Sequence, residues 1–228
     1  MKIMHIKLSK LSSEGENGIL IIRLMMALND LTLTNTCLAL YRDNNKKQDK
    51  YINDGACMYF IRLQIGHLYE GLKIIKKIFD NVELKNFVNS CSSDAQKAFK
   101  RLCQYIPGGA KRKDFDKYFG RIRHNLTFHY HEHGVWINQA LNERIDIKKQ
   151  KTSPITLGEV EKTRYELADQ IIDTIVCRNL FGISYDIDLQ SDRKELDRIL
   201  LFGSNINRDF IGFGGELIHN FTEKYLSI

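Results

Sequence analysis

The chain has 228 residues, of which 43% are hydrophobic and only two are proline. This hydrophobic content is enough to build a substantial core, which excludes an intrinsically disordered chain, and the scarcity of proline favours long helices over many short strands. The formal net charge of +6 permits an anionic partner such as nucleic acid but does not by itself demonstrate one.

Apolar residues recur at helical spacing along most of the chain, so the predicted fold class is all-α. In the first half, helices are expected over residues 18–42, from residue 53 or 54 to about residue 80, and over residues 82–106 with a break near residues 90–94. Ser93 to Gln96 fits a capping box after that break. Pro107-Gly108-Gly109 then ends the third helical region.

The fourth predicted helix begins near Asp114 and carries a single stripe of side chains. The steps along the stripe are four, three, four and three residues, which is the spacing of one helical face. Its members are Phe115, Phe119, Ile122, Leu126 and His129.

Three further helical segments are predicted in the second half. They cover residues 135–145, a region from a capping box at Thr156 to about residue 180, and two pieces from about residue 191 to 228 around Gly212 to Gly215. That glycine cluster has the composition of a turn, and a turn before a helix can bind an anion. The predicted organisation is a flexible lead (1–17), a helical core (18–147) and a C-terminal helical extension packed on the core (148–228), or one domain throughout.

The five cysteines are odd in number, widely spaced and without a Cys-x-x-Cys pair, which argues against a disulfide framework and against a zinc ribbon. Reduced thiols are expected. The first seven residues are too short and too charged for a signal peptide, and no segment reaches the roughly 18 apolar residues of a membrane span. The sequence therefore predicts a soluble, cytoplasmic protein without a membrane partner.

Chemically useful side chains are most concentrated in residues 111–133. Four of the seven histidines lie in residues 124–133, directly after residues 111–123, which contain six lysines and arginines against two aspartates. Histidine can take and give a proton near neutral pH, and arginine is the best fixed cation for gripping a phosphate. A charge run alone is typical of a solvated helix face, but the adjoining histidines favour a functional site.

Arg123-His-Asn-Leu-Thr-Phe-His129, with Tyr130 after it, resembles the signature of the HEPN superfamily, an arginine and a histidine separated by four to six residues. Many members of this superfamily are ribonucleases. The spacing of five falls inside the family's range, and the polar residue that usually follows the arginine is His124 here. The resemblance covers eight residues on a late helix of a helical chain, which is where the family's signature lies.

The resemblance implies a HEPN-like helical bundle over residues 18–147 with additional C-terminal helices. It also implies metal-independent RNA cleavage without a cofactor, in which a ribose 2′-hydroxyl attacks the adjacent phosphate and leaves a 2′,3′-cyclic phosphate. His129 would transfer the proton, Arg123 would stabilise charge on the phosphoryl oxygens, and His124 is the third catalytic candidate. The candidates for substrate binding are Asn125, Tyr130, Arg121 and Lys117.

The implied partners are RNA, a second copy of the chain, and an antitoxin or regulatory protein in a toxin–antitoxin or antiviral defence setting. Helix geometry gives a reason to expect the second copy of the chain. On an ideal helix an offset of six residues places Arg123 and His129 about 120° apart and about 9 Å along the axis, so they do not share a face. A helix end, the reach of arginine, or a composite site across a homodimer would bring them together.

Alternatives stay open at this point. His129 taken alone is typical of a hydrogen-bonded core residue, and Arg123 alone is typical of a surface cation. A HEPN-like fold could also bind nucleotide, RNA or protein without catalysis. His129 and His133 form an i, i+4 pair with Glu132 between them, which would suit a metal-dependent hydrolase if the helix continued through Gly134.

Overall fold

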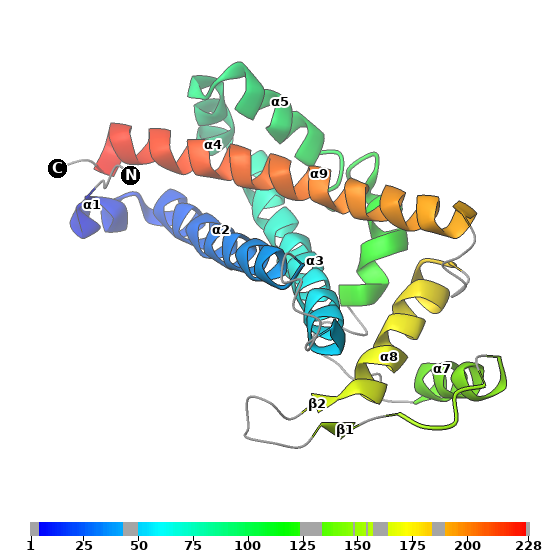
Figure 1. Cartoon of the computed structure of the whole chain (residues 1–228). Coiled ribbons are helices and arrows are strands. Elements are labelled where there is room, and N and C mark those ends of the chain that lie inside the picture. The colour runs from blue at the N-terminus through cyan, green and yellow to red at the C-terminus, as the bar shows by residue number, and fades with distance from the viewer. Residues whose placement is uncertain are drawn as a thin grey trace. The chain divides into compact units, whose positions relative to one another are not determined.

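The computed structural model describes residues 5–42, 50–123, 134–147, 149–153, 155–156, 164–183 and 190–226. This part of the chain is predominantly helical (Figure 1), which confirms the all-α class. Among its helices, none combines the length and the apolar character that crossing a membrane requires.

The elements follow one another along the chain with few extended residues. They are α1 (Leu8–Ser13), α2 (Gly15–Arg42), α3 (Lys50–Asp80), α4 (Val82–Phe87), the 3-10 turn η2 (Val88–Ser90), α5 (Ser93–Leu102), α6 (Arg112–Phe115), the π-helical segment η3 (Asp116–Gly120), α7 (Val135–Asp146), β1 (Ile155–Thr156), β2 (Arg164–Tyr165), α8 (Glu166–Thr174), the π-helical segment η6 (Ile175–Leu180), α9 (Gln190–Phe221) and the π-helical segment η7 (Thr222–Leu226). The predicted helices over residues 18–42, 53–80 and 135–145 are confirmed by α2, α3 and α7.

The predicted break near residues 90–94 is also confirmed, but the helix cap lies one residue earlier than expected. Ser92, not Ser93, is the N-cap of α5, and its side-chain oxygen accepts a hydrogen bond from the backbone N–H of Ala95 at 3.3 Å. The Gln96 amide does not return to the cap, because it donates to the backbone carbonyls of Asn89 at 3.2 Å and Cys91 at 2.9 Å. Both ends of the break are therefore hydrogen-bonded.

The structure also places a helix in residues 1–17, where the sequence predicts a flexible lead. Leu11 of α1 is buried, and the backbone N–H of Lys7 donates to the carbonyl of Leu226 at 3.0 Å. Gly15 then takes a left-handed φ of 56°, a conformation that costs glycine little, and α2 begins there. The buried Leu11 side chain and the hydrogen bond from Lys7 to Leu226 thus anchor a segment whose composition is mostly polar.

The helix predicted to begin at Thr156 begins at Glu166 instead. Thr156 belongs to β1 and pairs with Arg164 of β2 in an antiparallel register, and the helix that the structure describes after this pair is α8. Residues 157–163 lie outside the described part of the chain.

The predicted break at Gly212 to Gly215 is wrong, since α9 runs without interruption from Gln190 to Phe221. Phe213 between the glycines is fully buried, and a Cβ atom on Gly214 would lie 3.2 Å from a methyl group of Leu28. Gly214 thus permits a close approach of α9 to α2 rather than a turn. An anion-binding turn is excluded at this position because no helix begins there.

The chain divides into two compact units, each made of separate stretches. Unit 1 consists of Met1–Leu33, His67–Phe115 and Phe202–Ile228, and unit 2 consists of Thr34–Gly66 and Asp116–Leu201. The helices α2, α3 and α9 each contribute residues to both units. The units therefore do not follow the predicted boundary at residue 147.

Unit 1 is built on aromatic packing around the C-terminal half of α9, beside which α4 and α5 lie (Figure 1). Phe99 of α5 and Phe213 of α9 have ring centroids 4.8 Å apart. Arg101 makes two hydrogen bonds of 2.7 Å to the Asp209 carboxylate, which adds a charged link between the same two helices. These contacts join segments more than 100 residues apart in the sequence.

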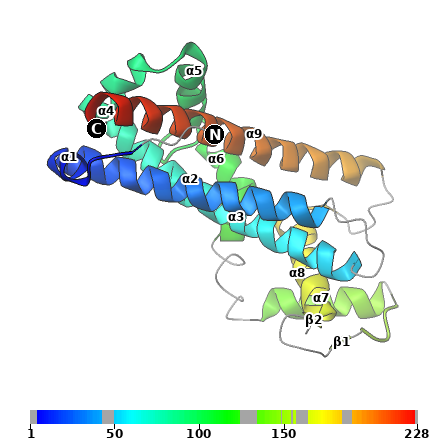
Figure 2. The same cartoon turned by 60° about the vertical axis from the view of Figure 1, so that its left-hand side comes forward.

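Unit 2 joins α7 to α8, which lie side by side in both views (Figure 2). Arg144 of α7 is buried, and it donates hydrogen bonds to the Gln150 side chain at 2.9 Å and to the Gln170 backbone carbonyl at 2.8 Å. The Arg178 guanidinium lies 2.9 Å from the Glu143 carboxylate. A buried arginine with these partners specifies how α7 and α8 pack.

The glycines of unit 1 give a matched stability prediction. A Cβ on Gly71 of α3 would lie 2.8 Å from the Phe210 ring, whereas a Cβ on Gly215 of α9 would meet nothing within 4 Å. Gly71→Ala is expected to lower the free energy of unfolding by about 1–2 kcal/mol, because overpacking outweighs the gain in helix propensity. Gly215→Ala is expected to raise it by about 0.5–1 kcal/mol. Urea denaturation followed by circular dichroism measures both changes. Equal changes in the free energy of unfolding for the two variants would contradict the contact between Gly71 and the Phe210 ring.

Candidate nucleic-acid interface

The first residue of the predicted signature, Arg123, is the last residue that the structure describes in a helix that begins with α6. The helix continues from α6 through η3 and includes Arg121 and Ile122. Phe115 and Ile122 are fully buried and Phe119 is nearly so, which confirms the predicted stripe as far as Ile122. The remaining members of the stripe, Leu126 and His129, lie outside the described residues.

The opposite side of this helix carries the cations. Lys117 and Arg121 are exposed and four residues apart, and Arg123 is half-buried. These three are the predicted site residues that the structure describes, and all belong to unit 2. The other predicted residues, His124, Asn125, His129 and Tyr130, lie outside the described part, as do Glu132 and His133 of the metal alternative.

Within unit 2, the Tyr118 ring brings one further cation, Arg198, near Lys117. Tyr118 is largely buried, and its ring centroid lies 5.0 Å from the Lys117 ammonium and 5.4 Å from the Arg198 guanidinium. The Arg198 guanidinium also donates a 2.5 Å hydrogen bond to the Tyr118 hydroxyl. Glu195 accepts two hydrogen bonds from Arg198, at 2.6 and 2.8 Å. We call Lys117, Tyr118, Glu195 and Arg198 the Tyr118 cluster.

The charges in the Tyr118 cluster support one another. Hydrogen bonding from Arg198 lowers the pKa of the Glu195 carboxyl, and the positive charges of Arg198 and Lys117 add to that effect. Hydrogen bonds to Glu195 and to Tyr118 raise the pKa of Arg198. Glu195 and Arg198 are therefore both charged near neutral pH. Since Arg198 and Glu195 are exposed, their ion pair orders the side chains more than it stabilises the fold.

The Tyr118 cluster was not predictable from the sequence. Arg198 and Tyr118 are 80 residues apart, so only the folded chain brings them into contact. The one local signal is that Glu195 and Arg198 are three residues apart, a spacing at which opposite charges pair on a helix. That signal indicates an ion pair and does not point to Tyr118.

The cationic side chains of this unit suit an extended anion. Lys117, Arg121, Arg123 and Arg198 are four cations of unit 2, of which Arg198 is paired with the Glu195 carboxylate. Within the ranges that the structure describes, no group of three or more histidine, cysteine, aspartate or glutamate side chains could hold a metal. A run of cations is typical of a surface that binds the phosphodiester backbone of a nucleic acid.

Comparison of the chain with protein-family models, with curated proteins and with solved structures finds no match. The resemblance to the HEPN superfamily therefore rests on residues 123–130. The all-α class agrees with that resemblance and is too general to establish it.

Proposed function

We propose that the chain is a metal-independent endoribonuclease with a HEPN-like site. The observation that carries the proposal is that Arg123, the first residue of the signature, is the last described residue of a helix whose exposed side chains Lys117 and Arg121 are cationic. A phosphate backbone bound along these cations would lead directly to the signature. Arg198 of the Tyr118 cluster adds a further positive charge in the same unit.

The proposed reaction is an internal transfer at phosphorus. The ribose 2′-oxygen bonds to the adjacent phosphorus as its proton leaves, and the bond from phosphorus to the 5′-oxygen of the next nucleotide breaks. The products are a 2′,3′-cyclic phosphate and a 5′-hydroxyl, so no water or metal ion is consumed. His129 transfers a proton, and Arg123 stabilises negative charge on the phosphoryl oxygens, with His124 in support.

The remaining predicted residues would hold the substrate. Lys117 and Arg121 contact phosphates, the Asn125 amide donates or accepts a hydrogen bond at a base or sugar, and the Tyr130 ring stacks on a base. A homodimer completes the proposed site, because on an ideal helix an offset of six residues would separate Arg123 from His129 by about 120°. We place the activity in a toxin–antitoxin or antiviral defence setting, where an antitoxin or regulatory protein would restrain it.

A cleavage assay on a mixed RNA pool in excess chelator tests the proposal. We expect cutting that resists the chelator and leaves 2′,3′-cyclic phosphate ends, identified by mass spectrometry of the fragments. Cleavage that disappears with the chelator and returns with added divalent metal would favour the hydrolase built on His129, Glu132 and His133. RNA binding without cleavage would favour a non-catalytic binding module.

The exposed cations give a prediction for RNA affinity. Lys117→Ala and Arg121→Ala are each expected to weaken single-stranded RNA binding and to lower the slope of log K against log salt by about 0.7, the value for one lost phosphate contact. Fluorescence anisotropy at several salt concentrations measures both quantities. Lys97→Ala is the control, since Lys97 is an exposed lysine of unit 1 beside Asp94, 3.4 Å away. An equal loss in the Lys97 variant would indicate a dependence on net charge alone.

A further inference from the structure

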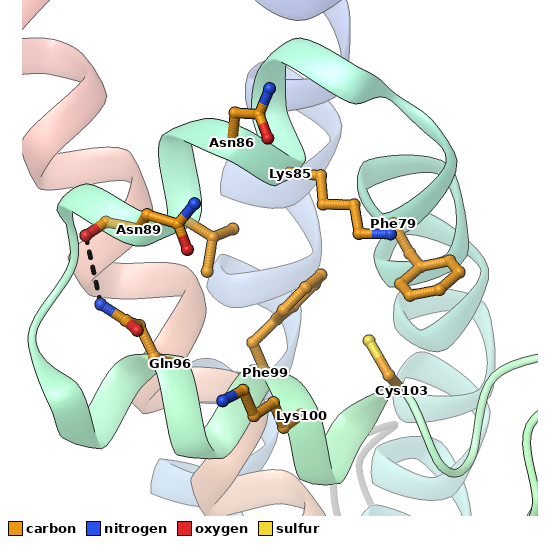
Figure 3. Close-up of a pocket in the computed structure, with 9 residues that line it drawn as sticks. Phe79, Lys85, Asn86, Asn89, Gln96, Phe99, Lys100 and Cys103 are labelled. Carbon is orange, nitrogen blue, oxygen red and sulfur yellow. Dashed lines mark hydrogen bonds between the residues drawn. The ribbon is translucent and has the colours of Figure 1, made fainter.

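A pocket in unit 1 is not used by the proposed cleavage reaction. The end of α3, α4 with η2, and α5 enclose a volume of about 310 Å³ (Figure 3). This size lies at the lower end of the roughly 300–1,000 Å³ of small-molecule sites. All of its lining residues fall between positions 79 and 103, so one continuous stretch of chain builds the whole pocket.

The wall of the pocket is apolar and aromatic. Phe99 and Val88 are buried in it, and the Phe79 ring and the Cys103 thiol complete it. Burial raises the pKa of Cys103 to about 11, although the nearby charge of Lys85 lowers it somewhat. The thiol is therefore uncharged at neutral pH and adds to the apolar wall.

The charged groups of the lining are all positive. They are Lys85 and Lys100, and no acidic side chain is among these lining residues. The Lys85 ammonium lies 4.0 Å from the centroid of the Phe79 ring, so a ligand ring that meets Phe79 would have a cation at its edge. Figure 3 shows Phe99 between this pair on one side and Gln96 with Asn89 on the other.

The amides on the other side favour a ligand that donates a hydrogen bond. Gln96 uses both amide hydrogens on the backbone carbonyls of Asn89 and Cys91, so the atom it can offer to a ligand is its carbonyl oxygen. Asn86 and Asn89 also line the pocket, and their side-chain amides can donate or accept. A hydroxyl or amino group on a ligand would satisfy the Gln96 oxygen.

We propose that this pocket binds a small aromatic carboxylate. Its ring lies against Phe99 and Phe79, its carboxylate pairs with the Lys85 ammonium, and a hydroxyl or amino substituent donates to the Gln96 carbonyl oxygen. The apolar wall selects a ring, and the positive charge selects an anion. The volume of the pocket limits the ligand to one or two fused six-membered rings. The site shares no residue with the proposed cleavage site and stands without it.

The probe for the test is 6-hydroxy-2-naphthoate, and the neutral comparison is 6-hydroxy-2-naphthamide, which has the same rings and no charge. Isothermal titration with the full chain is expected to show one saturable site that binds the carboxylate roughly tenfold more tightly than the amide. Lys85→Met removes the charge and keeps the aliphatic stem, so it should abolish that preference. Lys97→Met is the matched control, because Lys97 lies on α5 but does not line the pocket.

A second readout locates the binding. Alkylation of Cys103, followed by peptide mass spectrometry, should be slow at pH 7.5 and should accelerate up to about pH 11, because the thiolate is the reacting form. The carboxylate probe should slow this alkylation several-fold and leave the alkylation of the half-buried Cys37, which does not line the pocket, unchanged. Equal binding of carboxylate and amide, an unaltered preference in Lys85→Met, or an absence of Cys103 protection would each overturn the proposal.

Discussion

Arg123→Ala and His129→Ala are each expected to reduce RNA cleavage by about 10²–10⁴-fold without unfolding the chain. For His129 the reason is the loss of general acid–base catalysis, and for Arg123 it is the loss of a fixed positive charge at the phosphoryl oxygens. Single-turnover cleavage in excess chelator measures the chemical step. Arg208→Ala and His219→Ala are the controls, since both are solvent-accessible residues of α9 in unit 1. Unchanged cleavage in His129→Ala would remove that residue from proton transfer.

Mixing the two inactive variants distinguishes a composite site from one within a single chain. If each site takes Arg123 from one copy and His129 from the other, a mixed dimer contains one site with both residues intact. Random exchange of equal amounts should then restore about a quarter of the wild-type rate, because half of the dimers are mixed and each has one of its two sites intact. If both residues come from the same chain, every site in the mixture carries a defect and no activity returns.

Phe210→Ala is expected to lower the free energy of unfolding by about 3–5 kcal/mol. The ring of Phe210 is fully buried and lies against Gly71, where no neighbouring side chain can fill the space that the ring would leave. Chemical denaturation followed by circular dichroism measures the change. Leu33→Ala is the control, because Leu33 is 65% exposed and should change stability by less than about 0.5 kcal/mol. A cost below about 1 kcal/mol for Phe210→Ala would show that α9 does not pack on α3 in this way.

The helices were predictable where an apolar face repeats along one segment. Phe115, Phe119 and Ile122 show this clearly, since their spacing alone places them on one face and all three are buried. The same spacing leaves Lys117 and Arg121 on the exposed side. Local periodicity therefore predicted both the buried and the cationic side of the helix that leads into the signature.

The predictions from the sequence were wrong where one local pattern is compatible with two structures. Glycines break isolated helices, yet Gly214 lies inside α9 because its missing side chain lets Leu28 approach. A threonine before a polar turn can cap a helix, yet Thr156 pairs with Arg164 as a strand residue. The contact that decides the structure lies outside the local signal in both cases: Leu28 is far from Gly214 in the sequence, and Arg164 lies on the neighbouring strand.

Composition, apolar spacing and the order of residues 111–123 were sufficient to predict an all-α chain with a basic helix, because these features depend on interactions within a few turns of helix. The contact of Tyr118 with Arg198, the packing of Phe210 on Gly71 and the pocket lined by residues 79–103 are evident in the folded chain alone. Such contacts depend on which surfaces remain when helices pack, and a one-dimensional pattern does not contain that information.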